Sequence, residues 1–268
     1  MRRRLLCLAL PLLIAAAPGA LHAQPQGELR IGVEAAYPPF SELGPDGRLK
    51  GFDIDIANAL CTQLKLRCRL VQTEFDAMIP SLRAKKLDAI VASMSITEER
   101  SKAVDFSRLY YRSGNRFIGR EADRFEITAA GTKGKRIGVQ RNTINDRFVT
   151  AVFKDANIVR YARQDEAYLD LLSGRVDGVV VDAIAGSSGF LKTPQGKGYA
   201  FRGPVFDDPK YFGLGAGIAV RKGDTALRDR IDAALDALLA SGEHRRMQAR
   251  YFDIDISPPR PGTPAPSR

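Results

Sequence analysis

Histidine, cysteine and long apolar runs are all scarce in this chain. Its 268 residues include two histidines, His22 and His244, and three cysteines. So few imidazole and thiol groups, far apart in the sequence, do not form the clusters that are typical of metal sites. The single long apolar run, residues 5–17, is shorter than the roughly 20 residues of a membrane-spanning helix. The sequence therefore predicts neither a metal site nor a membrane span.

The first 23 residues have the pattern of a cleaved secretory signal. Three arginines at positions 2–4 precede the apolar run, and small residues up to Ala23 follow it. We expect cleavage near Ala23 and export of the remaining chain. Cys61 and Cys68 are the cysteines that remain, an even pair in a compartment where disulfides persist.

The spacing of Cys61 and Cys68 constrains the local structure. On one continuous helix they would be about 10 Å apart along the axis, beyond the reach of a disulfide. The helix expected over residues 53–63 must then end between them, before a strand over residues 67–71. The alternative is a metal site, but no further ligand lies nearby in the sequence. We predict a disulfide at this corner.

Basic residues outnumber acidic residues in this chain. The formal charge of +10 falls to +7 when the three arginines of the signal segment are removed. Lysines and arginines are dispersed rather than clustered, whereas a nucleic-acid-binding face concentrates them. We interpret the charge as a solvated surface and expect no nucleic-acid partner.

Two segments of the chain recur later in the same order. Residues 30–34 (RIGVE) return as 136–140 (RIGVQ), and residues 87–93 (LDAIVAS) return as 176–182 (VDGVVVD). Each copy indicates a strand, a helix-bearing segment and a second strand, which is typical of α/β units with parallel strands. Ligands of such sheets bind at the carboxyl ends of strands. The repeat thus predicts a cleft between two lobes, with four polar residues at strand ends: Glu34, Ser93, Gln140 and Asp182.

Residues 93–100 (SMSITEER) read as a turn from a strand, residues 87–92, into a helix. Ser95 or Thr97 followed by glutamates is a helix start. Arg100 then lies in the first turn, where the helix dipole disfavours a cation by roughly 0.3 to 1 kcal/mol. An anionic ligand would reverse this penalty, because hydroxyls, free amide groups and a guanidinium suit a carboxylate or phosphate. The competing interpretation is a surface ion pair with a neighbouring glutamate.

Asp182 supplies a charge of opposite sign. It follows a valine-rich strand, where a carboxylate contributes little to packing. Together with Arg100 it would hold an α-amino acid between one cation and one anion. Glu34 would face a positively charged side chain. Asp182 has an alternative role, because it can cap the helix that follows it.

Four motifs together carry a family resemblance: YPPF at 37–40, GFDID at 51–55, IPSL at 79–82 and the segment 93–100. Over the chain that follows the signal, the sequence resembles the periplasmic amino-acid-binding proteins of ABC importers, especially the lysine/arginine/ornithine and histidine binders. The resemblance implies a type II α/β clamp of two lobes, each a central β-sheet flanked by helices, joined by two hinge crossings. It places lobe 1 at 24–113 plus 213–256, lobe 2 at 114–212 and a disordered tail at 257–268.

The resemblance also assigns nine residues to the ligand, according to the part of an amino acid that they contact. They are Ser95, Arg100 and the backbone near Thr143 and Ile144 for the carboxylate, Ser93 and Asp182 for the ammonium, Tyr37 and Phe75 for the side chain, and Glu34 for its distal end. Four positions depart from the usual pattern: Glu34 replaces aspartate, Ala92 serine, Ile144 threonine and Asn142 glycine. Each lost hydroxyl removes about 1 kcal/mol, so the preferred ligand stays open, opines included.

The function implied is the binding of a cationic amino acid (arginine, lysine, ornithine or histidine) in the periplasm for a membrane permease. The implied protein is a monomer without cofactor, metal or catalytic residue. The alternative is an exported dehydratase for prephenate or arogenate on the same fold. Such an enzyme needs a general acid, for which Glu34 is a candidate without an obvious assisting group. A sensor domain is a third possibility, disfavoured because no transmembrane or kinase segment follows.

Overall fold

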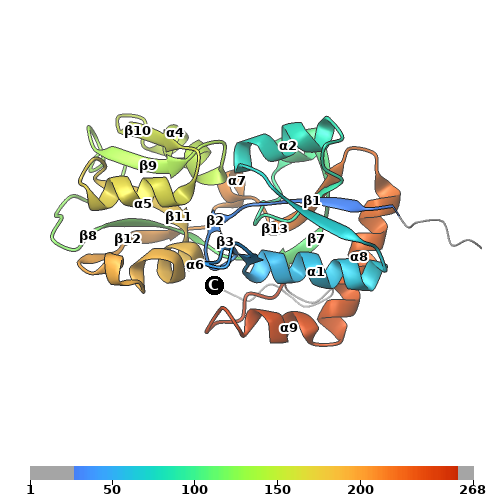
Figure 1. The fold of residues 1–268 in the computed structure, drawn as a ribbon. Coiled ribbons are helices and arrows are strands. Elements are labelled where there is room, and N and C mark those ends of the chain that lie inside the picture. The colour runs from blue at the N-terminus through green and yellow to red at the C-terminus, as the bar shows by residue number, and fades with distance from the viewer. Residues whose placement is uncertain (1–26, 259–268) are drawn as a thin grey trace, which may run out of the picture.

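A computed structural model describes residues 27–258 of the chain, which form two lobes side by side (Figure 1). Each lobe contains one five-stranded sheet, with strand orders β5-β1-β6-β13-β7 and β10-β9-β11-β8-β12. Lobe 1 is the body around the first sheet, and lobe 2 is the body around the second. The chain crosses to lobe 2 between β7 and β8 and returns between β12 and β13. This architecture confirms the predicted α/β clamp.

Lobe 1 contains the first seven strands, β13 and five helices. The strands are β1 (Leu29–Val33), β2 (Ala36–Tyr37), β3 (Ser41–Leu43), β4 (Leu49–Lys50), β5 (Cys68–Gln72), β6 (Ala89–Ile90), β7 (Val104–Tyr111) and β13 (Ala216–Arg221). The helices are α1 (Phe52–Leu64), α2 (Phe75–Arg83), α3 (Glu98–Ala103), α8 (Thr225–Ala240) and α9 (Glu243–Gln248). Strands β2, β3 and β4 form a separate small antiparallel sheet. The strand expected over residues 87–92 is shorter than predicted, because β6 covers Ala89–Ile90 and the chain turns away after Val91, whose N–H still bonds Gly32 of β1, to the left-handed Ser93.

Lobe 2 contains the remaining elements. The strands are β8 (Asn115–Arg120), β9 (Arg136–Gln140), β10 (Asn157–Tyr161), β11 (Gly178–Asp182) and β12 (Tyr199–Phe206). The helices are α4 (Ile144–Val152), α5 (Gln164–Leu172), α6 (Ala183–Gly186), α7 (Pro209–Phe212), a π-helix (Ser187–Leu191) and a 3-10 helix (Pro194–Gly196).

The internal repeat extends to side chains. Arg30 on β1 donates from its backbone and its guanidinium to Asp88, just before β6. In lobe 2, Arg136 on β9 makes the same contacts with Asp177, just before β11. The two pairs hold equivalent parallel strands together, β1 with β6 and β9 with β11. The repeated sequence therefore builds the same strand arrangement twice, and the same edge of each sheet carries polar residues.

An aromatic cluster fixes the start of α1 in lobe 1. Phe52, the first residue of the helix, is fully buried. Its ring lies 6.2 Å from that of Tyr110 and 5.2 Å from that of Phe252, measured between centroids. Gly51 has a φ of 126°, and a side chain there would collide with the backbone of Phe40. The next residue along the helix, Asp53, is thereby held beneath the loop that carries Ser93.

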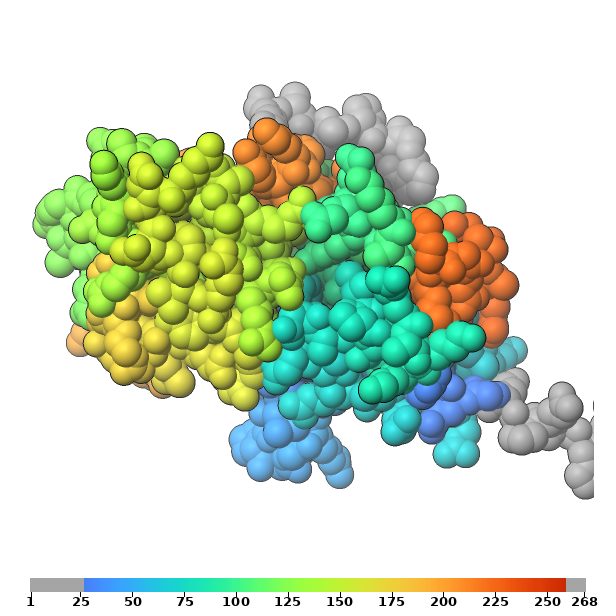
Figure 2. Space-filling model, turned by 90° about the horizontal axis from the view of Figure 1, so that it is seen from above, coloured from blue at the N-terminus to red at the C-terminus, as the bar shows by residue number. Residues whose placement is uncertain are grey.

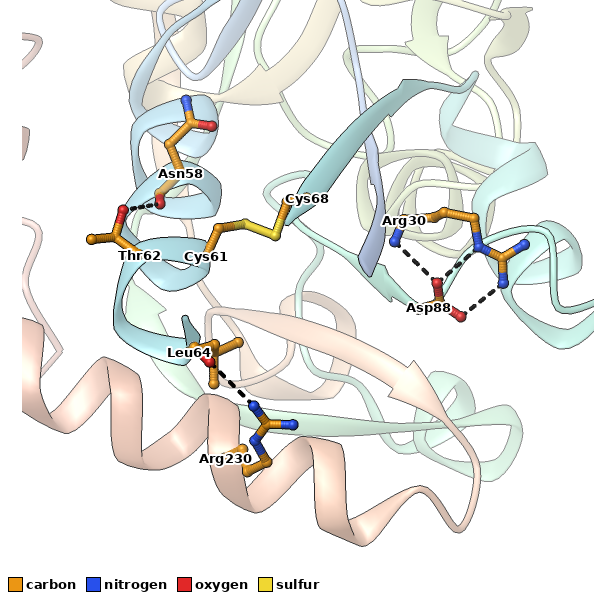
Figure 3. Close-up of a disulfide and its surroundings, with 8 residues drawn as sticks. All are labelled: Arg30, Asn58, Cys61, Thr62, Leu64, Cys68, Asp88 and Arg230. Atoms are coloured by element: carbon orange, nitrogen blue, oxygen red, sulfur yellow. Dashed lines mark hydrogen bonds and ion pairs between the residues drawn. A yellow bond between two sulfur atoms is a disulfide. The ribbon is translucent and has the colours of Figure 1, made fainter. Parts of the chain in front are cut away.

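Cys61 and Cys68 form the predicted disulfide (Figure 3), with a Cα–Cα distance of 6.0 Å. Helix α1 ends between them, where Lys65 takes a left-handed conformation and β5 begins at Cys68. The helix runs to Leu64 and the strand to Gln72, each within two residues of the expected bounds.

We expect replacement of both cysteines by serine to lower the free energy of unfolding by about 2 to 3 kcal/mol, because the unfolded chain regains the entropy of a short loop. Denaturant titration of the oxidised protein and the double variant measures this difference. Ligand affinity should not change, since neither cysteine lines the cleft between the lobes. A loss of affinity, or an unchanged unfolding free energy, would contradict the expectation.

Three predictions from the sequence are not tested by the described residues. The signal segment 1–23 and residues 259–268 of the expected tail lie outside the described residues. The numerical lobe boundaries stay a prediction. Within residues 27–258, no helix is long and apolar enough to span a membrane, and no group of histidine, cysteine and acidic residues has the arrangement of a metal site.

Candidate ligand-binding cleft

A cleft lies between the two lobes, at the carboxyl ends of β1, β6, β9 and β11. All four polar residues predicted at those strand ends line it. The nine residues assigned by family resemblance line it as well: Glu34, Tyr37, Phe75, Ser93, Ser95, Arg100, Thr143, Ile144 and Asp182. The structure thus gathers every predicted site residue in one place, while their individual contacts with a ligand stay predictions.

Arg100 is a buried cation on the lobe 1 side of the cleft. It is 9% exposed and sits in the first turn of α3, whose N-cap is Thr97. Its Nη1 donates to the carbonyl of Ser95 at 3.0 Å, and its Nη2 donates across the cleft to the carbonyl of Asn142 at 3.2 Å. The guanidinium carbon lies 5.2 Å from the ring centroid of Phe75. Burial lowers the pKa of Arg100 to about 10, so it stays charged at neutral pH.

The competing interpretation of Arg100, a surface ion pair with a neighbouring glutamate, is not what the structure contains. Glu98 pairs with Lys102, and Glu99 pairs with Arg147 of lobe 2. The guanidinium instead contacts two neutral carbonyls. Such an arrangement leaves a buried positive charge that an anionic ligand group would neutralise.

Asp182, the last residue of β11, lies on the lobe 2 side. Its Oδ1 accepts hydrogen bonds from the backbone N–H groups of Ile184 at 2.8 Å and Ala185 at 3.1 Å, so it caps α6. The alternative role foreseen for this residue is therefore real, and it does not exclude the first, because the same carboxylate lines the cleft. Burial raises its pKa to about 6, although bonds from the backbone and from Ser113 oppose this shift.

Glu34 and Gln140 meet across the far end of the cleft. The Nε2 of Gln140 donates to Oε1 of Glu34 at 2.7 Å and to the carbonyl of Ala162 at 3.2 Å. Glu34 is 5% exposed, and burial raises its pKa to about 8, against the opposing effect of the Gln140 hydrogen bond. Ionised Glu34 has no cationic partner among the described residues. A ligand ammonium or guanidinium group would supply that positive charge.

The two lobes contact each other at the rim of the cleft in this closed arrangement. Arg141 of lobe 2 pairs with Asp76 of α2, and Arg147 of α4 pairs with Glu99 of α3. Figure 2 shows the yellow-green surface of lobe 2 meeting the teal surface of lobe 1 along this boundary. The cleft residues are therefore held close enough for one small molecule to touch both lobes.

Several residues that line the cleft were not found by sequence reasoning. They lie on the two crossings between the lobes or at the start of α5: Tyr111, Arg112, Ser113, Asn115, Gln164, Asp207 and residues 212–216. The crossings themselves are a signal for the residues on them, because a crossing places its own residues beside the cleft, whereas nothing in the sequence singles out Gln164. Asn142 has a φ of 60°, as expected of a residue that replaces glycine in a left-handed turn. The side chain of Thr143 caps α4, so its hydroxyl is already bonded within the protein.

Comparison with known proteins agrees with this geometry. Residues 29–254 match the model of the bacterial extracellular solute-binding proteins, family 3. The L-arginine-binding protein of Pseudomonas aeruginosa is 50% identical over 85% of this chain and 89% of its own length. The histidine-binding periplasmic protein of Salmonella typhimurium is 40% identical over 96% and 99%.

A solved structure shares both the fold and much of the sequence. It is a periplasmic binding protein of Salmonella typhimurium, described for its high arginine specificity. The match has a TM-score of 0.78 with 36% identity and covers 84% of this chain and 99% of that one. The protein described here therefore belongs to the bacterial extracellular solute-binding proteins of family 3.

Proposed function

We propose that this protein is the periplasmic substrate-binding component of an ABC importer for cationic amino acids. Its relatives bear the names of arginine-, histidine- and lysine/arginine/ornithine-binding proteins, several of them periplasmic. The observation that carries the proposal is the arrangement of three buried ionisable groups in one cleft: the Arg100 cation in lobe 1, the Asp182 anion in lobe 2 and the Glu34 carboxyl at the far end.

This arrangement suits one class of small molecule. An α-carboxylate would neutralise Arg100, and an α-ammonium would neutralise Asp182. Tyr37 and Phe75 supply apolar walls, and Glu34 would receive the positive end of the side chain. Asn145 adds a buried Oδ1 that has no hydrogen-bond partner among the described residues. A ligand with several N–H donors would satisfy this acceptor.

Binding in this proposal is a shift between open and closed lobes. Arg100 and Asp182 belong to different lobes, so one amino acid engages both only when the cleft is closed. A ligand that contacts the closed form more extensively stabilises it by that difference in affinity. The closed form, as a monomer, would then be recognised by the membrane permease, and no bond of the ligand would break.

Thermal unfolding against a panel of compounds tests the proposal. We expect arginine, lysine, ornithine or histidine at about 100 times its dissociation constant to stabilise the ligand-stripped protein by roughly 2.7 kcal/mol. The Asp182→Ala variant should lose this stabilisation. Stabilisation by neutral or acidic amino acids alone would contradict the cationic ligand. Turnover of prephenate or arogenate, assayed in parallel, would contradict the transport proposal and favour the dehydratase alternative.

A further inference from the structure

The motif GFDID contributes a carboxylate, Asp53, that the proposed binding contacts do not use. Asp53 lies at the start of α1, is 0% exposed and lies directly behind Ser93, which lines the cleft. Its Oδ2 accepts a hydrogen bond from Ser93 Oγ at 2.9 Å. Its Oδ1 accepts one from the hydroxyl of Tyr110 at 2.8 Å. A buried carboxylate without a cationic partner is costly, so its place beneath a cleft residue calls for an explanation.

The direction of each hydrogen bond in this group is determined by counting protons. Tyr110 has a single hydroxyl hydrogen, and its oxygen already accepts the backbone N–H of Ser93 at 2.9 Å. That hydrogen must therefore point to Asp53 Oδ1. Ionised Asp53 can only accept, so the hydroxyl hydrogen of Ser93 points to Oδ2. Ser93 Oγ is left with its lone pairs, which it presents to the cleft and to the cleft-lining side chain of Tyr111.

The backbone holds Ser93 in this position. Its φ of 51° is a left-handed conformation that a serine rarely adopts, and the bond from its N–H to Tyr110 fixes the turn. Tyr110 is itself fully buried, and its carbonyl contacts Nε2 of His244 at 2.6 Å. Tyr110 thus holds the backbone of Ser93 and Asp53 orients its hydroxyl, and neither of these two residues lines the cleft.

We propose that Asp53 is a positioning residue for ligand selection, which acts through Ser93 by making its hydroxyl an obligate hydrogen-bond acceptor toward the ligand's α-ammonium. The inference rests on the proposed function and adds a residue to it. An acceptor-only hydroxyl attracts a cationic donor, whereas a hydroxyl that turns its hydrogen toward the cleft repels one. Asp53 never touches the ligand in this arrangement.

The Asp53→Asn variant tests the proposal because its hydrogen bonds are predictable. The Tyr110 hydroxyl hydrogen requires an acceptor, so the amide oxygen takes the place of Oδ1 and the amide nitrogen faces Ser93 Oγ. The amide then donates to Oγ, and the hydroxyl hydrogen of Ser93 turns to the cleft. With L-arginine as the probe, calorimetry at about pH 8 should show affinity about tenfold weaker than wild type, the loss of one hydrogen bond to a charged group.

A cycle with Ser93→Ala separates this role from a general effect on the fold. If Asp53 acts through Ser93, the substitution at Asp53 has no further effect once the hydroxyl is removed, so the double variant should bind L-arginine within about twofold of Ser93→Ala. Losses that add in the double variant would overturn the proposal, as would wild-type affinity in Asp53→Asn. Asp55→Asn is the matched control: it is the same substitution on the same helix, but Asp55 bonds Tyr251 and Arg250 away from the cleft.

The pH dependence of the affinity distinguishes this role from a purely structural one, which would not change with pH. Burial raises the pKa of Asp53 to about 7, so acidification protonates it and inverts the Ser93 hydroxyl as the asparagine does. The affinities of wild type and Asp53→Asn should therefore converge when the pH is lowered to about 6. Other titratable groups that interact with Asp53 remain in both proteins and cancel in the comparison: Glu34, Tyr110, Tyr111 and Asp182. The same holds for His244, which contacts the carbonyl of Tyr110.

The outcomes distinguish this inference from the proposed function. A wild-type protein that binds none of arginine, lysine, ornithine and histidine contradicts the proposed function, and the inference with it. A wild-type protein that binds L-arginine but keeps the same affinity ratio to Asp53→Asn at both pH values contradicts the inference alone. If Asp53→Asn does not fold, Ser93→Ala carries the test, since it should lose the same pH-dependent step.

Discussion

The Arg100→Lys variant is expected to bind L-arginine at least about 100-fold more weakly than wild type. Lysine keeps the positive charge but not the planar fork that now reaches Ser95 and Asn142 in opposite lobes. It also loses the cation–π contact of the guanidinium with Phe75. A single ammonium cannot hold a ligand carboxylate and both carbonyls in the same geometry, so both closure and carboxylate binding are weakened.

Isothermal titration calorimetry of purified, ligand-stripped protein measures this loss. Arg108→Lys is the control, because Arg108 is a half-exposed arginine of the same lobe that pairs with Asp236 and does not line the cleft. It should bind like wild type. An affinity for Arg100→Lys within about threefold of wild type would show that charge alone suffices, contrary to the role proposed for the fork.

The ligand-free protein is expected to lose stability as the pH rises from about 5 to 8, and Glu34→Gln to remove much of this loss. The folded pKa of Glu34 is about 8, well above its ordinary value, because the carboxyl is buried. Between the two pKa values the folded protein holds a proton that the unfolded chain has released. The contribution of Glu34 to the free energy of unfolding is therefore fully present at low pH and is lost as the pH approaches its folded pKa. We expect a loss of about 1 to 3 kcal/mol, because partial opening of the cleft reduces the effect of burial.

Binding should show the opposite trend. A cationic side chain favours ionised Glu34, so affinity for L-arginine should increase with pH up to about 8. Glu34→Gln should weaken that affinity by about 100-fold or more, since it leaves a buried cation without its counter-charge. Denaturant titrations and calorimetry across this pH range measure both effects. Glu42→Gln is the control, because Glu42 belongs to the neighbouring strand β3 and pairs with Lys50 outside the cleft. Equal binding of arginine by Glu34→Gln and wild type would refute the assignment of Glu34.

The two pH effects together bear on how the protein would release its ligand. Three buried carboxyls, Glu34, Asp53 and Asp182, have raised pKa values in the closed arrangement. Each favours the proton in the empty closed form and a cationic ligand in the occupied one. Acidification should therefore compete with cationic ligands for the same cleft, and the competition should be strongest for ligands with two positive charges.

Much of the fold was predictable because its signals are local. Apolar strand runs, the N-cap at Thr97 and the separation of Cys61 from Cys68 each depend on residues within a few turns of chain. The repeated segments indicate two similar α/β units. In such units the carboxyl ends of the parallel strands bring polar residues to one edge of the sheet. These patterns predicted the cleft and the four polar residues at its strand ends, although the strand over residues 87–92 was predicted too long. The remaining assigned residues came from the family resemblance, and the residues on the crossings were missed.

The sequence by itself determined the main strands and helices and the repetition of one strand–helix–strand unit. It also determined the disulfide at the corner after α1 and the polar residues at the strand ends. Only the tertiary structure decided how those residues are bonded. The bonds from Gln140 to Glu34, from Arg100 to Asn142 and from Ser93 to Asp53 join residues 106, 42 and 40 positions apart. Local propensity and periodicity carry no information on such pairs, since their geometry arises from packing of the sheet and closure of the lobes.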